Sequence, residues 1–284
     1  MRLSILLAGL VLATAPATHS LAQVQPAPAA HADHVQHITL PTADGRSVDL
    51  SIWPAAEEKG VVVFSHGFNG APAAYDRILS AWAAHGFTIV APLHVDSLRH
   101  PEHDRYDNRD AFRTRLIDLG VARGFVKVAH AGKPIIAAGH SFGSLMSLIE
   151  GGALTAAGPL GDPDVRGVIA FSTAGDLPGV VTPDTYGALN TPLLLITGDQ
   201  DLVPGYVTDW TQHRTPFDRS ATGDKTLMIF AGADHELVGR ADEAQFSALT
   251  EATEAFLDAY ALGDATAKDR LQALNATGVT IERR

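Results

Sequence analysis

Ser141 stands inside the stretch GHSFG (139–143), between two glycines and at the junction of two apolar runs. A sharp turn at that junction accounts for the glycines but not for the serine. A serine hydroxyl becomes a nucleophile when a neighbouring base takes its proton and a third group orients the base. The chain offers acidic and basic candidates downstream, at Asp199, Asp201 and His235.

The segments around these residues follow two alternating patterns. Unbroken apolar runs, typical of strands buried on both faces, alternate with stretches of helical spacing, which indicates an α/β fold with a mostly parallel sheet covered by helices on both faces. Alternating residues on either side of Asp44-Gly45 predict an antiparallel hairpin at the N-terminal edge, at 35–41 and 47–53. A polar tail is expected to end the chain. We expect further strands at 60–67, 87–94, 133–140, 166–173, 191–199 and 225–233, and helices at 74–86, 109–131, 141–154, 241–262 and about 264–274.

The candidate residues follow the ends of the predicted strands. In such sheets ligands bind in the crevice outside the carboxyl ends of the strands. The residues at those ends are His66, Gly67 and Phe68, then Ser141, then Asp199 and Asp201, and finally Asp234 and His235. A nucleophile, an acid and a base are therefore predicted at one edge of the sheet, in the chain order Ser, Asp, His.

This arrangement resembles the α/β-hydrolase superfamily, whose nucleophile elbow has the pattern G-x-S-x-G between a strand and a helix. Such an elbow lifts the hydroxyl of Ser141 above the sheet edge, at a helix N-terminus that favours developing negative charge. The resemblance implies that His235, in the segment FAGADHEL, is the base. The segment LLLITGDQDLVP resembles the family's G-x-x-D-x-x-V-P, which selects Asp201 as the acid, with Asp199 as its rival and Asp176 as a more distant alternative.

The same resemblance implies an oxyanion hole built from two backbone N–H groups. One is expected from Phe142, directly after the nucleophile, and the other from Phe68 in the loop SHGFNG. We interpret His66 as a residue that orients this loop. The expected mechanism requires no cofactor and no metal.

Three segments, VVVFSHGFNG, GHSFGS and DPDVRGVIAFS, are most similar to bacterial dienelactone-hydrolase-like and platelet-activating-factor-acetylhydrolase-like esterases. Cutinases and polyester hydrolases are close in layout, and the resemblance covers roughly residues 35–262. Dienelactone hydrolases proper use a cysteine nucleophile, which this chain lacks. Polyester hydrolases usually carry a tryptophan where this chain has Ser-Thr-Ala-Gly (172–175), so half of their aromatic clamp is missing, although Phe68 can serve as the other half.

We therefore expect a secreted serine esterase that forms an acyl-enzyme on Ser141. An amidase, a peptidase, a lactonase or a polyester hydrolase with the same triad stays open, because pocket shape determines the substrate. A catalytically inactive hydrolase fold that binds a ligand is the alternative from another class, and a metal-dependent hydrolase is a third. The expected partner is a small-molecule or polymeric ester, while the acyl group, the alcohol group and the oligomeric state are not specified by the sequence.

Four polar segments call for separate interpretation. We interpret 94–110 as a polar loop at the rim of the site, with metal binding as the alternative, because its spacing fits no standard zinc pattern. Its potential ligands are His94, Asp96, His100, Glu102, His103 and Asp104. Three further histidines, His31, His34 and His37, recur every three residues; we interpret them as a disordered tail that runs into the edge strand, with metal capture as the alternative. The segment 176–190 predicts a small cap over the site, and 210–218 predicts an addition to its rim.

Composition sets the remaining limits. The chain has 284 residues, of which 46% are hydrophobic, which is enough for one large domain, expected over 34–284. Its formal net charge of −11 argues against nucleic acid as a partner, and the absence of cysteine excludes disulfides and thiolate catalysis. A positive start, an apolar stretch and Ser-Leu-Ala at 20–22 predict a signal peptide over 1–22, cleaved after about Ala22, followed by a disordered lead-in at 23–33. Export without a stable membrane anchor is therefore expected.

Overall fold

A computed structural model describes residues 35–175, 177 and 180–284. The predicted signal peptide (1–22), the lead-in (23–33) and Asp176 lie outside the described residues. Among those described, no helix has the length and apolar character needed to cross a membrane.

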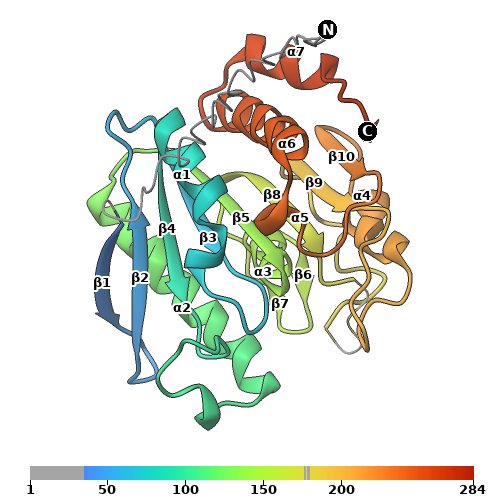
Figure 1. Cartoon of the computed structure of the whole chain (residues 1–284). Coiled ribbons are helices and arrows are strands. Elements are labelled where there is room, and N and C mark those ends of the chain that lie inside the picture. Colours follow the sequence, from blue (N-terminus) through green and yellow to red (C-terminus); the bar gives the residue numbers. More distant parts are fainter. Residues whose placement is uncertain (1–34, 176, 178–179) are drawn as a thin grey trace, which may run out of the picture. The chain divides into compact units, whose positions relative to one another are not determined.

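The described strands form a nine-stranded sheet in the order β1-β2-β4-β3-β5-β8-β9-β10-β11 (Figure 1). Pairing is parallel from β4 to β10, and it is antiparallel between β1 and β2, between β2 and β4, and between β10 and β11. The strands are β1 (Gln36–Pro41), β2 (Ser47–Trp53), β3 (Gly60–Ser65), β4 (Phe87–Leu93), β5 (Ile135–Ser141), β8 (Val165–Thr173), β9 (Leu193–Gly198), β10 (Lys225–Phe230) and β11 (Val279–Arg283). The predicted hairpin and parallel sheet are thereby confirmed.

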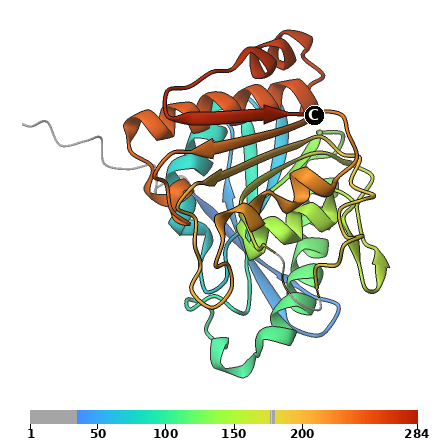
Figure 2. The ribbon, with the colours of Figure 1, turned by 90° about the vertical axis from the view of Figure 1, so that its right-hand side faces the viewer.

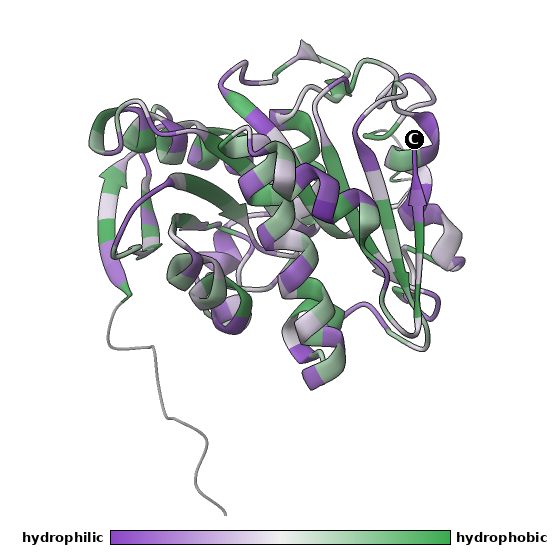
Figure 3. Ribbon diagram, turned by 90° about the horizontal axis from the view of Figure 1, so that it is seen from above, coloured by the Kyte–Doolittle hydropathy of each residue, from purple (hydrophilic) through white to green (hydrophobic). Residues whose placement is uncertain are grey.

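Helices cover both faces of this sheet. The longer ones are α1 (Asp76–His85), α2 (Asn108–Ala129), α3 (Phe142–Glu150), α6 (Glu243–Phe256) and α7 (Ala265–Ala273). The short ones are η2 (Pro72–Tyr75), η3 (His103–Arg105), η4 (Trp210–Arg214), α4 (Thr215–Arg219), α5 (Leu237–Arg240) and the π-helical η5 (Leu257–Ala261). Figure 3 shows mostly apolar strands and helices that carry both polar and apolar residues, as expected for helices with one buried side.

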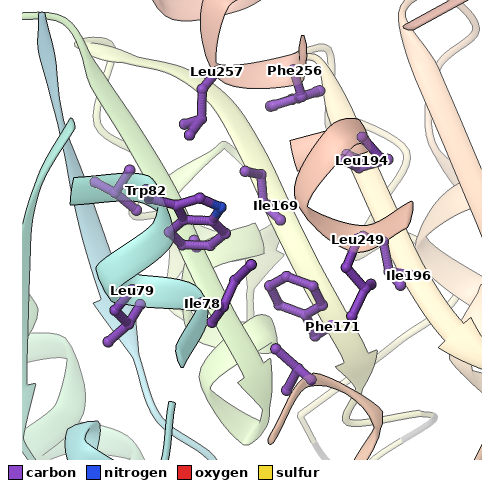
Figure 4. Packing of buried hydrophobic residues seen from close by; sticks show 14 of the residues in the cluster. Ile78, Leu79, Trp82, Ile169, Phe171, Leu194, Ile196, Leu249, Phe256 and Leu257 are labelled. Atoms are coloured by element: carbon purple, nitrogen blue, oxygen red, sulfur yellow. The ribbon is translucent and has the colours of Figure 1, made fainter. Parts of the chain in front are cut away.

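Two apolar clusters occupy the two faces, because successive strand residues point to opposite sides of a sheet. On one face, α1 and α6 pack on the strands, and Figure 4 shows Trp82, Phe171 and Leu249 meeting there. The rings of Trp82 and Phe171 stack with their centroids 6.2 Å apart. On the other face, α2 and α3 pack through residues such as Leu119 and Leu145.

The sequence-based prediction was wrong about the end of the chain. Val279–Arg283 is not a polar tail but β11, which pairs antiparallel with β10 and covers that edge of the sheet (Figure 2). Val279 and Ile281 are partly buried against the core. Only these two apolar positions alternate within a charged segment, so the period-two signal is too short to stand out in the sequence. A second small hairpin, β6 (Leu154–Thr155) with β7 (Gly158–Pro159), was also not anticipated.

Candidate active site

The turn between β5 and α3 places Ser141 at the carboxyl edge of the sheet. Its backbone is strained, with φ 54° and ψ −120°, a conformation that non-glycine residues rarely adopt. The two flanking glycines are sterically required, since a Cβ on Gly139 would lie 2.8 Å from the carbonyl oxygen of Ser65 and one on Gly143 would overlap that oxygen. The chain therefore bends here with β3 and α3 in direct backbone contact, and this holds the serine in its strained geometry.

The structure brings Asp201 and His235 together. Nδ1 of His235 donates to Oδ1 of Asp201 at 2.7 Å, and Thr197 donates to the other carboxylate oxygen at 2.7 Å. Burial would raise the pKa of the Asp201 carboxyl, but the hydrogen bonds from His213 and His235 outweigh it and hold that pKa well below its usual range. The rival Asp199 instead accepts the backbone N–H of Gly232 at 2.7 Å.

His235 is thus fixed in the tautomer that suits a base. With Nδ1 protonated and bonded to Asp201, the lone pair lies on Nε2. His235 and Ser141 both line the pocket described below. The structure thus pairs the imidazole of His235 with a buried carboxylate, in the pocket that Ser141 also lines.

A chain of hydrogen bonds, not anticipated from the sequence, joins the loops around Ser141. The backbone N–H of Gly67 donates to the hydroxyl oxygen of Tyr75 at 3.0 Å, and that hydroxyl pairs with Nδ1 of His140 at 2.9 Å. Nε2 of His140 in turn donates to the carbonyl oxygen of His235 at 2.8 Å. Burial lowers the pKa of His140 to about 3, so its imidazole is neutral and can both accept and donate.

A buried arginine binds the loop that follows β3 and carries Phe68. Arg115, in α2, donates to the carbonyl oxygens of His66 and Gly67 at 2.6 and 3.2 Å. Its guanidinium also forms a two-pronged pair with Asp96, at 2.8 and 2.7 Å. His66 donates to the Gly67 carbonyl at 2.7 Å and accepts from a backbone N–H, so it has the loop-orienting position expected for it.

The prediction that residues 94–110 form a polar loop at the rim is wrong for the first residues of that segment. His94 and Asp96 are buried beneath the Phe68 loop instead of exposed at the rim. His94 contacts Asp118 and Ser65, both at 3.0 Å. Their polarity reflects an internal network that the isolated sequence cannot reveal, because the partners come from β3 and α2.

One residue of the segment 210–218 does not fit the predicted addition to the rim. His213, in η4, is fully buried and lies behind Asp201. Within the described part of the chain, one group of His, Cys, Asp and Glu side chains has metal-like spacing, and it consists of Asp201, His213 and His235. No sequence pattern singled out His213, which stands far from the other two in the chain and outside any family motif.

A pocket of about 340 Å³ opens beside Ser141 and His235. Its walls are largely apolar and come from the loop after β3, from α2 and from segments that follow β8 and β9. Leu177 and Val180, from the predicted cap segment, contribute to it. Its lining residues are Phe68, Phe112, Ser141, Phe142, Thr173, Ala174, Leu177, Val180, Val203, Tyr206, Val207 and His235.

The two residues predicted to supply the oxyanion hole contact each other in the lining of this pocket. The rings of Phe68 and Phe142 approach edge to face, with centroids 6.3 Å apart. Phe142 is the first residue of α3, so its backbone N–H has no partner within the helix. An N–H group at a helix N-terminus is suited to bind an anionic oxygen.

Sequence comparison finds no family model and no curated protein that matches this chain. Solved structures do resemble it. A dienelactone hydrolase from Anabaena variabilis has a TM-score of 0.61 and 16% identity, over 80% of this chain and 99% of its own. A cold-adapted esterase from an Arctic intertidal metagenomic library has a TM-score of 0.59 and 16% identity, over 80% and 95%. A puromycin-hydrolyzing peptidase from Mycobacterium tuberculosis has a TM-score of 0.60 and 15% identity, over 80% of this chain but 39% of its own.

These similarities, together with the sheet order and the elbow, show that the chain has the α/β-hydrolase fold. At this level of identity they establish the fold alone. The activity has to be argued from the side chains at the edge of the sheet.

Proposed function

We propose that the protein is a serine hydrolase that cleaves carboxylic esters through Ser141, His235 and Asp201. The observation that carries the proposal is the 2.7 Å hydrogen bond from His235 to Asp201, because His235 and the strained Ser141 line the same apolar pocket. The strain at Ser141 has no evident structural purpose, since an ordinary strand-to-helix turn needs no φ above zero at a serine. Strain of this kind concentrates at functional sites.

In the first half-reaction, Oγ of Ser141 attacks the ester carbonyl carbon while Nε2 of His235 takes the hydroxyl proton. The carbonyl oxygen becomes an anion, and the N–H groups of Phe68 and Phe142 are proposed to stabilise it. One such donor typically contributes about 3 kcal/mol of transition-state stabilisation. The C–O bond to the alcohol then breaks, and the leaving alkoxide receives the proton from His235.

In the second half-reaction, water attacks the acyl-enzyme. His235 takes a proton from the water, the bond to Oγ of Ser141 breaks, and the proton returns to that oxygen as the carboxylic acid leaves. Throughout both steps Asp201 holds the imidazole in one tautomer and compensates its positive charge.

The lining of the pocket favours esters over peptides and amides. A peptide substrate brings additional N–H and C=O groups, which cost free energy when they are buried without partners. Apart from Ser141, Thr173, Tyr206 and His235, the described lining residues offer no polar side chain. We therefore assign a neutral ester with an apolar acyl or alcohol group as the substrate class.

We also propose that the protein is exported after cleavage near Ala22. The support is the charged start, apolar stretch and Ser-Leu-Ala site at its N-terminal end. Intact mass measurement of the protein recovered from the periplasm or medium of an expressing bacterium tests this, since a mature chain beginning at Gln23 is expected and a full-length chain would contradict it.

The activity is tested by hydrolysis of p-nitrophenyl esters of increasing acyl length. We expect turnover that depends on chain length, is unaffected by a chelator, and is lost in Ser141→Ala. Ser80→Ala, at a partly buried position of α1 outside the pocket, is the matched control and should keep wild-type rates. Turnover that survives in Ser141→Ala, or that the chelator abolishes, would overturn the proposal.

A further inference from the structure

His213 is enclosed by hydrogen-bond acceptors on both sides of its ring. Nδ1 lies 2.6 Å from the carbonyl oxygen of Thr173, at the end of β8. Nε2 lies 2.8 Å from Oδ1 of Asp201 and 3.0 Å from the backbone carbonyl of the same residue. A carbonyl oxygen cannot donate a hydrogen, so Nδ1 must carry a proton.

The second nitrogen is under the same constraint. The Asp201 carboxylate accepts hydrogen bonds from His235 and Thr197. Burial would raise its pKa, but the hydrogen bonds from the two histidines hold that pKa well below the usual range, so the carboxylate is ionised. Both oxygens that face Nε2 are therefore acceptors, and Nε2 must donate as well. An imidazole that donates from both nitrogens is an imidazolium.

We infer that His213 is a buried imidazolium that serves as the counter-ion of Asp201 and positions it for His235. Two histidines then share one carboxylate oxygen, since Nδ1 of His235 and Nε2 of His213 both donate to Oδ1 of Asp201. Asp201 is fully buried, and an isolated buried carboxylate is costly unless a charge partner and hydrogen bonds compensate it. His213 provides both.

The local backbone is built to hold this imidazolium in place. Ser172 has a positive φ of 45°, and the register of β8 against β5 shifts between His140 and Ser141. After this irregularity the carbonyl of Thr173 points to His213, and the Thr173 hydroxyl donates back to the His213 carbonyl at 2.9 Å. The side chain and backbone of His213 are thus both anchored to β8.

A positive charge on His213 affects the pH dependence of activity, and this consequence rests on the proposed function. The rings of His213 and His235 lie 5.7 Å apart, so a fixed positive charge on His213 disfavours a proton on His235. The Asp201 carboxylate favours a proton on His235, but it is present in both wild type and a His213 variant and so does not change the direction of the difference. His140 is neutral, and Arg214 is directed to Asp218 and Glu282.

The direct test is the imidazole 15N–1H spectrum of the wild-type protein labelled at histidine nitrogens. At pH 7 we expect two N–H correlations from His213, assigned by their loss in His213→Gln and by contacts to Thr173 and Asp201. One correlation, with the other nitrogen unprotonated, would overturn the inference. This readout needs no turnover, so it stands or falls separately from the proposed esterase activity.

The second test is the acid limb of kcat/KM against pH for wild type and His213→Gln, which removes the charge while keeping a donor. We expect the limb to move to higher pH in the variant, because the positive charge beside His235 is gone. His130→Gln is the matched control, since His130 also bonds a carboxylate, that of Glu58, at 2.7 Å but lies far from the pocket. A limb that stays in place or moves to lower pH would contradict a charged His213. Should His213→Gln fail to fold, the wild-type spectrum decides alone.

Discussion

Nε2 of His140 donates a 2.8 Å hydrogen bond to the backbone carbonyl of His235, so the residue directly before Ser141 holds the loop of the proposed base. The variable position of the G-x-S-x-G motif thereby links the nucleophile elbow to His235. The same imidazole continues through Tyr75 to the backbone of Gly67. Three loops that approach the pocket from β3, β5 and β10 are joined by one neutral histidine.

This link predicts the effect of replacing His140. We expect His140→Ala to lower kcat by about tenfold to a hundredfold with a smaller change in KM, because loss of one buried hydrogen bond costs about 1–3 kcal/mol and leaves the His235 loop less ordered. His140→Gln retains a donor and should recover part of the loss. Steady-state kinetics well below the melting temperature is the measurement. Equal kcat in His140→Ala and wild type would show that the link is not needed for activity.

The contact between β3 and α3 predicts opposite outcomes for two glycine replacements. Gly143→Ala should destabilise the protein by about 3 kcal/mol or prevent folding, because its Cβ would overlap the backbone of Ser65. Gly120→Ala, at an exposed helical position in α2 with no atom near the new Cβ, should stabilise by up to about 1 kcal/mol. Urea denaturation compares the two variants with wild type. A Gly143→Ala protein as stable as wild type would contradict the described elbow.

The fold and part of the site could be predicted from the sequence because their signals are local. Ser141 is marked by two glycines within two residues of it, and each buried strand by its own apolar run. Of the two carboxylates after β9, the motif favoured Asp201, and the structure places that one beside His235. In these cases the residues that determine the structure are neighbours in the chain.

What could not be predicted depends on partners that are distant in sequence. His213, in η4, contacts Asp201 and Thr173, which lie 12 and 40 residues before it in the chain. Asp96 looked like part of a solvated loop until Arg115, from α2, was placed beside it. β11 forms because β10 offers it an edge, and not because its own five residues have strong strand periodicity.

Buried Asp118 predicts a specific pH dependence of stability. Burial raises the pKa of its carboxyl to about 6, although Arg46 opposes this. The folded protein therefore holds a proton that the unfolded chain has already released between about pH 4 and pH 6. The stability from this group is complete below about pH 4 and declines as the pH rises, by about 3 kcal/mol in total.

Asp118→Asn removes this decline. Measured by urea denaturation from pH 4 to pH 7, the free energy of unfolding of Asp118→Asn relative to wild type should increase with pH. Asp164→Asn, at an exposed position, should run parallel to wild type throughout. Parallel curves for Asp118→Asn and wild type would contradict a raised pKa at Asp118.

The pocket wall at Ala174 predicts a change in acyl-chain preference. Ala174→Trp places a bulky ring inside a cavity of about 340 Å³, so the preferred p-nitrophenyl ester should become shorter, with at least about tenfold loss of kcat/KM for the longest chains. Ala129→Trp, exposed at the end of α2, should leave the preference unchanged. An unaltered chain-length profile in Ala174→Trp would mean that the acyl group binds elsewhere.

The central claim is that Ser141 is an activated nucleophile, and covalent labelling tests it most directly. The protein is treated with a fluorophosphonate, and the modified residue is located by mass spectrometry of its peptides. We predict one adduct on Ser141 in wild type, no adduct in Ser141→Ala, labelling slowed by a factor of about a hundred or more in His235→Ala, and wild-type labelling in Ser80→Ala. No labelling of the folded wild-type protein, or labelling at another residue with Ser141 untouched, would contradict the account.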